Sequence, residues 1–167
     1  MNPDVFDDDE AAWSVAATPD GKHIISGSSA SLVRVWSVAG KNLVSTCAHD
    51  DQVWAVAAMP DCQRFLSGGY DKTIRVWLVD GTHENTFRLH GDKVWALVAM
   101  PDNLHALSGS EDKTIKLFNV NDGAALRTFT HHEKAVRSLA LLPDGLRFVS
   151  GSDDKTARIV EIGLAPL

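Results

Sequence analysis

The 167-residue sequence has few cysteines and no long apolar run. Its two cysteines, Cys47 and Cys62, could form at most one disulfide, which excludes a disulfide-stapled scaffold. No stretch approaches the roughly 20 apolar residues that a membrane-spanning helix needs, and the acidic N-terminus lacks the pattern of a signal peptide. We therefore expect a cytoplasmic protein with free thiols and no membrane contact, and leave the nucleus open as an alternative compartment.

Basic residues are also too few for a nucleic-acid-binding protein. Lysine and arginine number 16 against 22 aspartates and glutamates, which gives a net charge of −6. Five of the acidic residues lie in the first ten positions, so residues 11–167 are nearly neutral. Neither part of the chain complements the negative phosphate backbone. We expect residues 1–10 to form a solvated acidic segment and predict no nucleic-acid partner.

The sequence signatures of cofactor and metal sites are missing too. The pair Gly68-Gly69 closes a predicted strand but precedes no helix, so it does not form a phosphate-binding loop. The pair His131-His132 has no cysteine or carboxylate at a recognisable metal-ligand spacing. We predict no cofactor and no metal, and expect His131 to be a solvated loop residue.

What the sequence does contain is a four-fold internal repeat with a period of 41 or 42 residues. The dipeptide Pro-Asp begins at positions 19, 60, 101 and 143, and Ser-Gly begins at positions 26, 67, 108 and 150. The triplet Asp-Lys-Thr keeps the same period in the last three units. The chain therefore consists of four copies of one module, at about residues 11–48, 49–89, 90–131 and 132–167.

Each module has the pattern of four short strands. In the second module, apolar and β-branched residues favour strands at residues 53–59, 63–67 and 73–79, and a more polar strand at residues 84–89. Turn signals such as Pro60-Asp61 and Asp80-Gly81 separate them. A lone sheet of this size cannot bury both of its faces, so we expect the four sheets to stack on one another.

These motifs resemble the repeats of the WD-repeat β-propeller family. A His four residues before a Val is followed by Pro-Asp, Ser-Gly, Asp-Lys-Thr and an aromatic residue in the third strand, and the period fits the roughly 40–45 residues of that family. The second and third units keep most of this pattern, whereas the first and fourth are degenerate. The resemblance implies an all-β propeller with four blades of four antiparallel strands per chain.

The resemblance also implies a hydrogen-bonded relay of His, Ser, Asp and Trp inside each blade, in which buried polar atoms are paired. The relay residues are His49, Ser67, Asp71, Trp77, His90, Ser108, Asp112, His132, Ser150 and Asp154. Phe118 and Val160 replace the Trp in the third and fourth units. The first unit has Asp8 and Ala30 at the His and Asp positions, so we predict a broken relay and the least rigid blade.

The same residue types could be interpreted as a Ser-His-Asp catalytic triad. A triad is needed once, beside a single oxyanion site. Here the set recurs in three copies, in step with the turn and strand markers. We therefore favour the structural relay and predict a non-enzymatic protein without catalytic residues.

The resemblance further places residues of three registers on the narrow face of the propeller, where partners dock. The predicted partner-binding residues are Trp13, Trp54, Trp95, Arg137, Gln52, Lys93, Tyr70, Glu111 and Asp153. Large, rigid Trp and Tyr side chains dominate many protein interfaces. The alternative is that the three tryptophans pack between neighbouring blades, although Arg137 at the same register favours exposure.

Four repeats are fewer than the blades of most closed propellers, and the fourth repeat reaches only three strands by Ile162. Two copies could pair into an eight-bladed ring, each donating residues 1–6 to the other's last blade. The chain could instead belong to a longer protein or pair with another half-propeller, or its four blades could close alone. We favour the two-fold ring because it closes every strand edge.

The repeats supply rigidity and a wide surface but no unique reactive constellation. We therefore predict a non-enzymatic scaffold that binds a protein or peptide partner on the narrow face. The alternative is a self-assembling structural subunit, which forms a closed propeller by homodimerisation and has no separate ligand.

Overall fold

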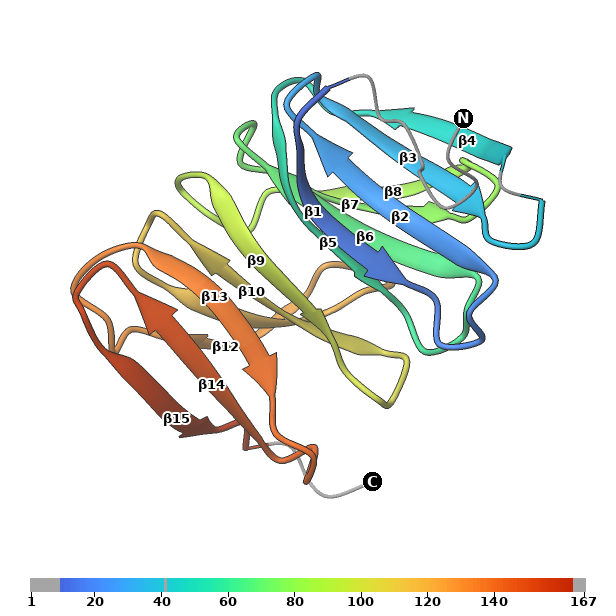
Figure 1. Ribbon diagram of the computed structural model, residues 1–167. Helices are drawn as coiled ribbons and strands as arrows, with labels where there is room; N and C mark the ends of the chain where they lie inside the picture. Colours follow the sequence, from blue (N-terminus) through green and yellow to red (C-terminus); the bar gives the residue numbers. More distant parts are fainter. Residues whose placement is uncertain (1–9, 41, 164–167) are drawn as a thin grey trace.

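The computed structural model describes residues 10–40 and 42–163, which form fifteen β-strands and no helix. The strands make four antiparallel sheets, numbered here as blades 1–4 in chain order (Figure 1). Blade 1 contains β1 (Ala12–Ala17), β2 (His23–Ser28), β3 (Leu32–Ser37) and β4 (Asn42–Ala48). Blade 2 contains β5 (Val53–Ala58), β6 (Arg64–Gly69), β7 (Ile74–Leu78) and β8 (His83–Phe87).

Blade 3 contains β9 (Val94–Ala99), β10 (His105–Ser110), β11 (Ile115–Asn119) and β12 (Ala125–Phe129). Blade 4 contains β13 (Val136–Leu141), β14 (Arg147–Ser152) and β15 (Ala157–Glu161). The all-β propeller prediction is confirmed, with four strands in each of blades 1–3 and three in the described part of blade 4. The N-terminal residues 1–6, considered as a source of the missing strand, lie outside the described residues.

The strands of blade 2 differ in burial because the blade lies between two neighbouring blades. The second strand, β6, is buried almost throughout, whereas the outer strand β8 is mostly exposed. The sequence placed the end of the second strand too early, because Gly68 and Gly69 belong to β6 and pair with Ile74 and Val53. These glycines therefore continue the strand instead of closing it.

The four sheets follow one another along an open arc. The first strands of successive blades are neighbours, β1 beside β5, β5 beside β9 and β9 beside β13. Figure 1 shows blade 1 at one end of this arc and blade 4 at the other, with β1 and β13 separated by β5 and β9. The four blades of one described chain therefore do not close on themselves.

Three apolar clusters fill the boundaries between blades. The first lies between blades 1 and 2 and includes Val35, Val53 and Val56. The equivalent residues at the next boundary are Val76, Val94 and Leu97, and at the last boundary Leu117, Val136 and Leu139. The same registers thus form each internal boundary, so the repeated sequence produces a repeated interface.

Glycine in the Ser-Gly motif permits the close approach of neighbouring blades. A methyl group on Gly68 would lie 2.8 Å from Cγ1 of Val94 in blade 3, and one on Gly27 would lie 2.7 Å from Cγ1 of Val53. Both distances are shorter than two carbon atoms tolerate. Because glycine has no side chain, the first valine of the next blade can pack directly against the backbone at this position.

Candidate functional site

The relay residues of blade 2 form a continuous hydrogen-bonded chain. Nε1 of Trp77 donates to Oγ of Ser67 at 2.7 Å, and Oγ of Ser67 lies 2.6 Å from Nε2 of His49. Nδ1 of His49 lies 2.9 Å from Oδ2 of Asp71. Because the ionised Asp71 carboxylate can only accept, Nδ1 of His49 carries a proton and donates it to Asp71. In the neutral imidazole with that tautomer, Nε2 accepts from the Ser67 hydroxyl.

Asp71 fixes the tight turn between β6 and β7. Its Oδ2 accepts from the backbone N–H of Asp50, and its Oδ1 accepts from the backbone N–H and hydroxyl of Thr73. Burial raises the pKa of Asp71, but hydrogen bonds from His49 and Thr73 outweigh burial and hold that pKa well below its usual range. The carboxylate therefore holds the turn, in which Lys72 has a φ of 65°.

Blade 3 repeats this geometry without the Trp. Nδ1 of His90 lies 2.9 Å from Oδ2 of Asp112, and Nε2 lies 2.7 Å from Oγ of Ser108. Phe118 occupies the Trp register and is fully buried. Asp112 also accepts from Thr114, and its pKa, which burial raises, is held well below its usual range by His90 and Thr114.

Blade 4 contains the same three residues and one that the sequence did not predict. His132 lies 2.7 Å from Oδ2 of Asp154 and 2.7 Å from Oγ of Ser150. Nε2 of His131 lies 3.2 Å from the same serine oxygen, and its ring packs against Phe148 and His132. His131 does lie in a loop, as expected, but the expectation that it is solvated is wrong, because it is half-buried and contacts Ser150, for which Val160 offers no donor.

Within the residues that the structure describes, blade 1 has the serine and tryptophan of the relay. Nε1 of Trp36 donates to Oγ of Ser26 at 3.4 Å, a longer bond than that of Trp77 in blade 2. Ala30 stands at the register of the turn aspartate, where it offers no acceptor. Asp8, at the histidine register, lies outside the described residues. The greater mobility of this blade stays a prediction.

The tryptophans at the start of each blade's first strand form a ladder across blade boundaries. The rings of Trp13 and Trp54 stack with centroids 4.7 Å apart and an interplanar angle of 11°. Trp54 meets Trp95 edge to face, also at 4.7 Å. The guanidinium carbon of Arg137 lies 4.1 Å from the centroid of Trp95, which extends the ladder into blade 4.

The ladder combines the two readings that the sequence left open. Trp54 and Trp95 are half-buried and contact each other between blades, whereas Trp13 is 48% exposed at the blade 1 end. Nε1 of Trp54 is buried without a hydrogen-bond partner among the described residues. The repeat period identifies these four positions as one register, but only the folded chain shows that the rings touch.

Charged and polar residues line the ladder. Nε1 of Trp95 donates to Oε2 of Glu111 at 2.6 Å, and Arg137 pairs with the same oxygen at 3.2 Å. Arg137 also donates twice to Asp153, and this pairing lowers the pKa of the Asp153 carboxyl. Arg137 is exposed, as its register led us to expect. It is nevertheless paired, because Glu111 and Asp153 both lie at the neighbouring register.

Lys93 and Tyr70 make a similar contact between blades 3 and 2, with Nζ of Lys93 3.9 Å from the centre of the Tyr70 ring. Backbone hydrogen bonds explain why these registers gather at one end of the sheets. The residue before each turn aspartate donates its N–H to the carbonyl two positions before the ladder residue, as Tyr70 does to Gln52 and Glu111 to Lys93.

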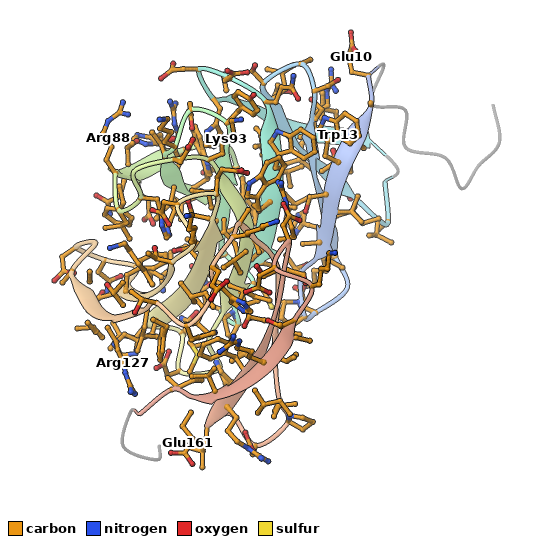
Figure 2. All side chains as sticks on the ribbon, turned by 90° about the vertical axis from the view of Figure 1, so that its left-hand side faces the viewer. Glu10, Trp13, Arg88, Lys93, Arg127 and Glu161 are labelled. Atoms are coloured by element: carbon orange, nitrogen blue, oxygen red, sulfur yellow. The ribbon has the colours of Figure 1, made fainter. Side chains whose placement is uncertain are left out.

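We name this end the ladder face and define it by the nine predicted partner-binding residues. They are Trp13, Trp54, Trp95, Arg137, Gln52, Lys93, Tyr70, Glu111 and Asp153. Figure 2 shows Trp13 and Lys93 near Glu10 at one end of the molecule, with Arg127 and Glu161 at the other end. The structure therefore brings residues from all four blades together on one surface.

The described residues contain no group of three or more His, Cys, Asp or Glu side chains that could hold a metal ion. Nor does any helix long and apolar enough to span a membrane occur within residues 10–40 and 42–163. The serine oxygens of the relays are buried, and each already has a histidine partner. The relay geometry can therefore hold turns in place.

Comparisons with known proteins agree with this architecture. The family model for the WD domain, G-beta repeat, matches four times, at residues 5–37, 40–77, 81–119 and 123–161. The last three matches each begin just before an outer strand, β4, β8 or β12, and include the three strands that follow. A search of curated proteins found no matching relative. The four matches cover most of the chain, which therefore belongs to the WD-domain, G-beta repeat family.

Proposed function

We propose that this chain is a non-enzymatic scaffold that binds a protein or peptide partner on the ladder face. Repeats of its family generally serve as scaffolds for protein–protein interaction. The observation that carries the proposal is the unbroken ladder of Trp13, Trp54, Trp95 and Arg137, which spans all four blades and ends in an exposed ring.

The composition of the ladder face suits protein recognition. Trp, Tyr and Arg are the residues most enriched among interface hot spots, because they bury a large area and also offer polar atoms. Lys93, Glu111 and Asp153 add charges of both signs around the rings. The surface can therefore contact an apolar side chain of a partner and orient its flanking charges.

The relays support this face by fixing the turns that present it. In blade 2, Asp71 holds the turn that contains Tyr70, and in blade 3 Asp112 holds the turn that contains Glu111. A side chain on a fixed turn loses less conformational entropy on binding. We therefore assign the relay residues a structural role and the ladder face the binding role.

Burial of the relay serines also supports a function without catalysis. Oγ of Ser67, Ser108 or Ser150 would have to reach a substrate in order to act as a nucleophile. All three serines have no exposed surface, and the three sets are equivalent in geometry. We propose the cytoplasm as the compartment, consistent with the acidic composition and the free Cys62 thiol.

A displayed library of random peptides, selected against the immobilised full chain, provides the probe for this proposal. We expect the enriched peptides to lose at least about tenfold in affinity for the Trp13→Ala variant, because a truncated hot spot costs more than 1.4 kcal/mol. Fluorescence anisotropy of labelled peptides measures the affinities.

Leu126→Ala is the matched control, since Leu126 in the outer strand β12 is 49% exposed, like Trp13, and lies outside the ladder face. Peptides that bind the Trp13→Ala and Lys93→Ala variants as tightly as the unchanged chain would refute the assignment of the ladder face. A selection that enriches no peptide would count against a peptide-binding scaffold.

A further inference from the structure

Exposed apolar side chains mark the outward sides of the two end blades. Val15 in β1 is 69% exposed, and Ile159 in β15 is 63% exposed. Both lie in the interior of a strand, where side chains normally pack against a neighbouring sheet. Blades 1 and 4 lie at opposite ends of the arc (Figure 1), so no other described blade of the same chain covers their outward sides.

The residues equivalent to Val15 and Ile159 in the other blades are buried or partly buried at the boundaries between blades. Val15 corresponds to Val56 and Leu97, which pack against the preceding blade and are buried. Ile159 corresponds to Val76 and Leu117, which pack against the following blade and are also buried. The outward side of blade 1 therefore has the residues that elsewhere pack against a preceding blade. The outward side of blade 4 has the residues that elsewhere pack against a following blade.

A polar contact across the first boundary adds a second correspondence. Oγ of Ser14 in blade 1 accepts a hydrogen bond of 3.1 Å from the backbone N–H of Val56 in blade 2. The equivalent residues at the other two internal boundaries are Ala55 and Ala96, which cannot accept such a bond. Blade 4 again has a serine, Ser138, at this register, on its uncovered side.

The glycine of the Ser-Gly motif in blade 4, Gly151, faces no residue of another described blade, unlike the equivalent glycines of blades 1–3. At the three internal boundaries the equivalent glycine receives the first valine of the next blade, such as Val94 above Gly68. Above Gly151 the nearest atom is Oγ of Ser138, 2.6 Å from the position a methyl group would take. The residue of blade 1 at the valine register is Ala12, which is smaller than the valine that Gly27 accommodates beside Ser14 and therefore fits above Gly151.

We propose that the uncovered side of blade 4 binds the uncovered side of blade 1 in a second copy of this chain. Val15 of the incoming copy packs against Ile159, Ala12 lies above Gly151, and the backbone N–H of Val15 donates to Oγ of Ser138. The contact reproduces the internal boundary between blades 1 and 2 and buries apolar surface that is otherwise exposed.

The ladder continues across the same contact. Arg137 is its last member in blade 4, and the next register belongs to Trp13 of the second copy, whose outer ring face is open. A guanidinium group between two indole rings gains cation–π attraction from both. Ladder and core thus agree on the same partner and the same register.

Two such contacts related by a two-fold axis join the copies into one ring of eight blades. Each copy supplies both halves of the interface, so the two contacts cover the outward sides of blades 1 and 4 in both copies. Ser138 can accept from the backbone of Val15 as Ser14 does from that of Val56, which the alanines at this register in blades 2 and 3 cannot do, so the contact favours this chain over an unrelated repeat.

Trp13 belongs both to this contact and to the ladder face, whereas Lys93 belongs to the ladder face alone. A Lys93→Ala variant that loses peptides but remains a dimer therefore separates this inference from the proposed function.

Sedimentation velocity of the full chain at micromolar concentration tests the proposal. We expect a mass of two copies for the unchanged chain, and a mass of one copy for Val15→Lys and for Ile159→Glu, because each single variant buries an unpaired charge in the contact. Combining Val15→Lys with Ile159→Glu places opposite charges side by side and restores the dimer.

Leu126→Glu is the control, since it adds the same charge at an exposed position outside the contact and leaves the dimer intact. Restoration by the double variant shows that the single variants are folded and that the two sides meet. A monomer of the unchanged chain would overturn the proposal, as would a dimer that survives both single variants or a double variant that stays monomeric.

Discussion

At the scale of single residues, the relays show how one carboxylate organises a turn. Asp112 accepts hydrogen bonds from His90, from the backbone of Gly91 and from Thr114, so it joins the segment before β9 to its own turn between β10 and β11. A buried carboxylate with this many donors favours its charged form over its protonated form. The relay therefore contributes most where Asp112 is ionised.

This ionisation predicts a specific loss of stability in acid. Burial raises the pKa of Asp112, but His90 and Thr114 hold it well below its usual range. A group whose pKa is depressed by folding stabilises the fold above its unfolded pKa, about 3.9, and loses that contribution as the pH falls further. We expect Asp112→Asn to lower the free energy of unfolding by about 1–3 kcal/mol at pH 7 and to flatten its decline below pH 4.

Urea denaturation at several pH values measures both effects. Asp122→Asn serves as the control, because Asp122 is exposed and only caps a turn through the backbone of Ala124. An Asp112→Asn protein that keeps the full acid dependence of the unchanged chain would show that this carboxylate is not its source.

The relay members could be predicted from the sequence because the repeated motifs resemble those of the WD-repeat family, and that resemblance implies the relay. His131 could not, since the motif assigns the relay position to His132 alone, and only the loss of Trp at Val160 hints at a vacant partner for Ser150. The contact between Arg137 and Glu111 also lies beyond the sequence, because it joins neighbouring blades whose separation depends on how the sheets stack.

At the scale of the strand and sheet, the sequence predicts the alternation of strands and turns well but the ends of the strands less accurately. Pro60-Asp61 correctly separates β5 from β6, because proline cannot continue the ladder of hydrogen bonds. Gly68-Gly69 misled, since glycine usually weakens a strand. Here Gly68 leaves room for the next blade, and Gly69 leaves room for the backbone of Gln52 in its own blade. A local signal was thus overridden by packing between and within sheets.

This packing predicts that two glycine-to-alanine substitutions in neighbouring segments change the stability by different amounts. We expect Gly68→Ala to destabilise the chain by about 1–3 kcal/mol, because its methyl group would lie 2.8 Å from Cγ1 of Val94 and 3.2 Å from Cδ1 of Leu97. Gly91→Ala meets no heavy atom within 4 Å and should change stability by no more than about 0.5 kcal/mol. Chemical denaturation of both variants decides, and equal effects would contradict the role of Gly68 in leaving room for the next blade.

At the scale of the whole molecule, each blade's stability depends on its neighbours and on its relay. Blades 2 and 3 are covered on both sides by other blades and contain complete His-Ser-Asp sets. Within one chain, blade 4 is covered on one side and has such a set, whereas blade 1 is covered on one side and has Ala30 at the aspartate register. Their outward sides are covered only by the contact between copies proposed above, which opens when the copies dissociate. In a linear array of repeats, stability is the sum of such intrinsic and boundary contributions.

Hydrogen exchange of the backbone amides should therefore follow the order of these contributions. We expect the slowest exchange in β6 and β10, faster exchange in β14 and the fastest in β2, because local opening requires the loss of fewer contacts in that order. The variant His132→Ala removes the relay of blade 4 and should bring the exchange of β14 close to that of β2, while β6 stays protected. Mass spectrometry of peptic fragments from both proteins makes the comparison. If β2 were as well protected as β6 in the unchanged chain, neither the missing relay nor the single covered side would control the rigidity of blade 1.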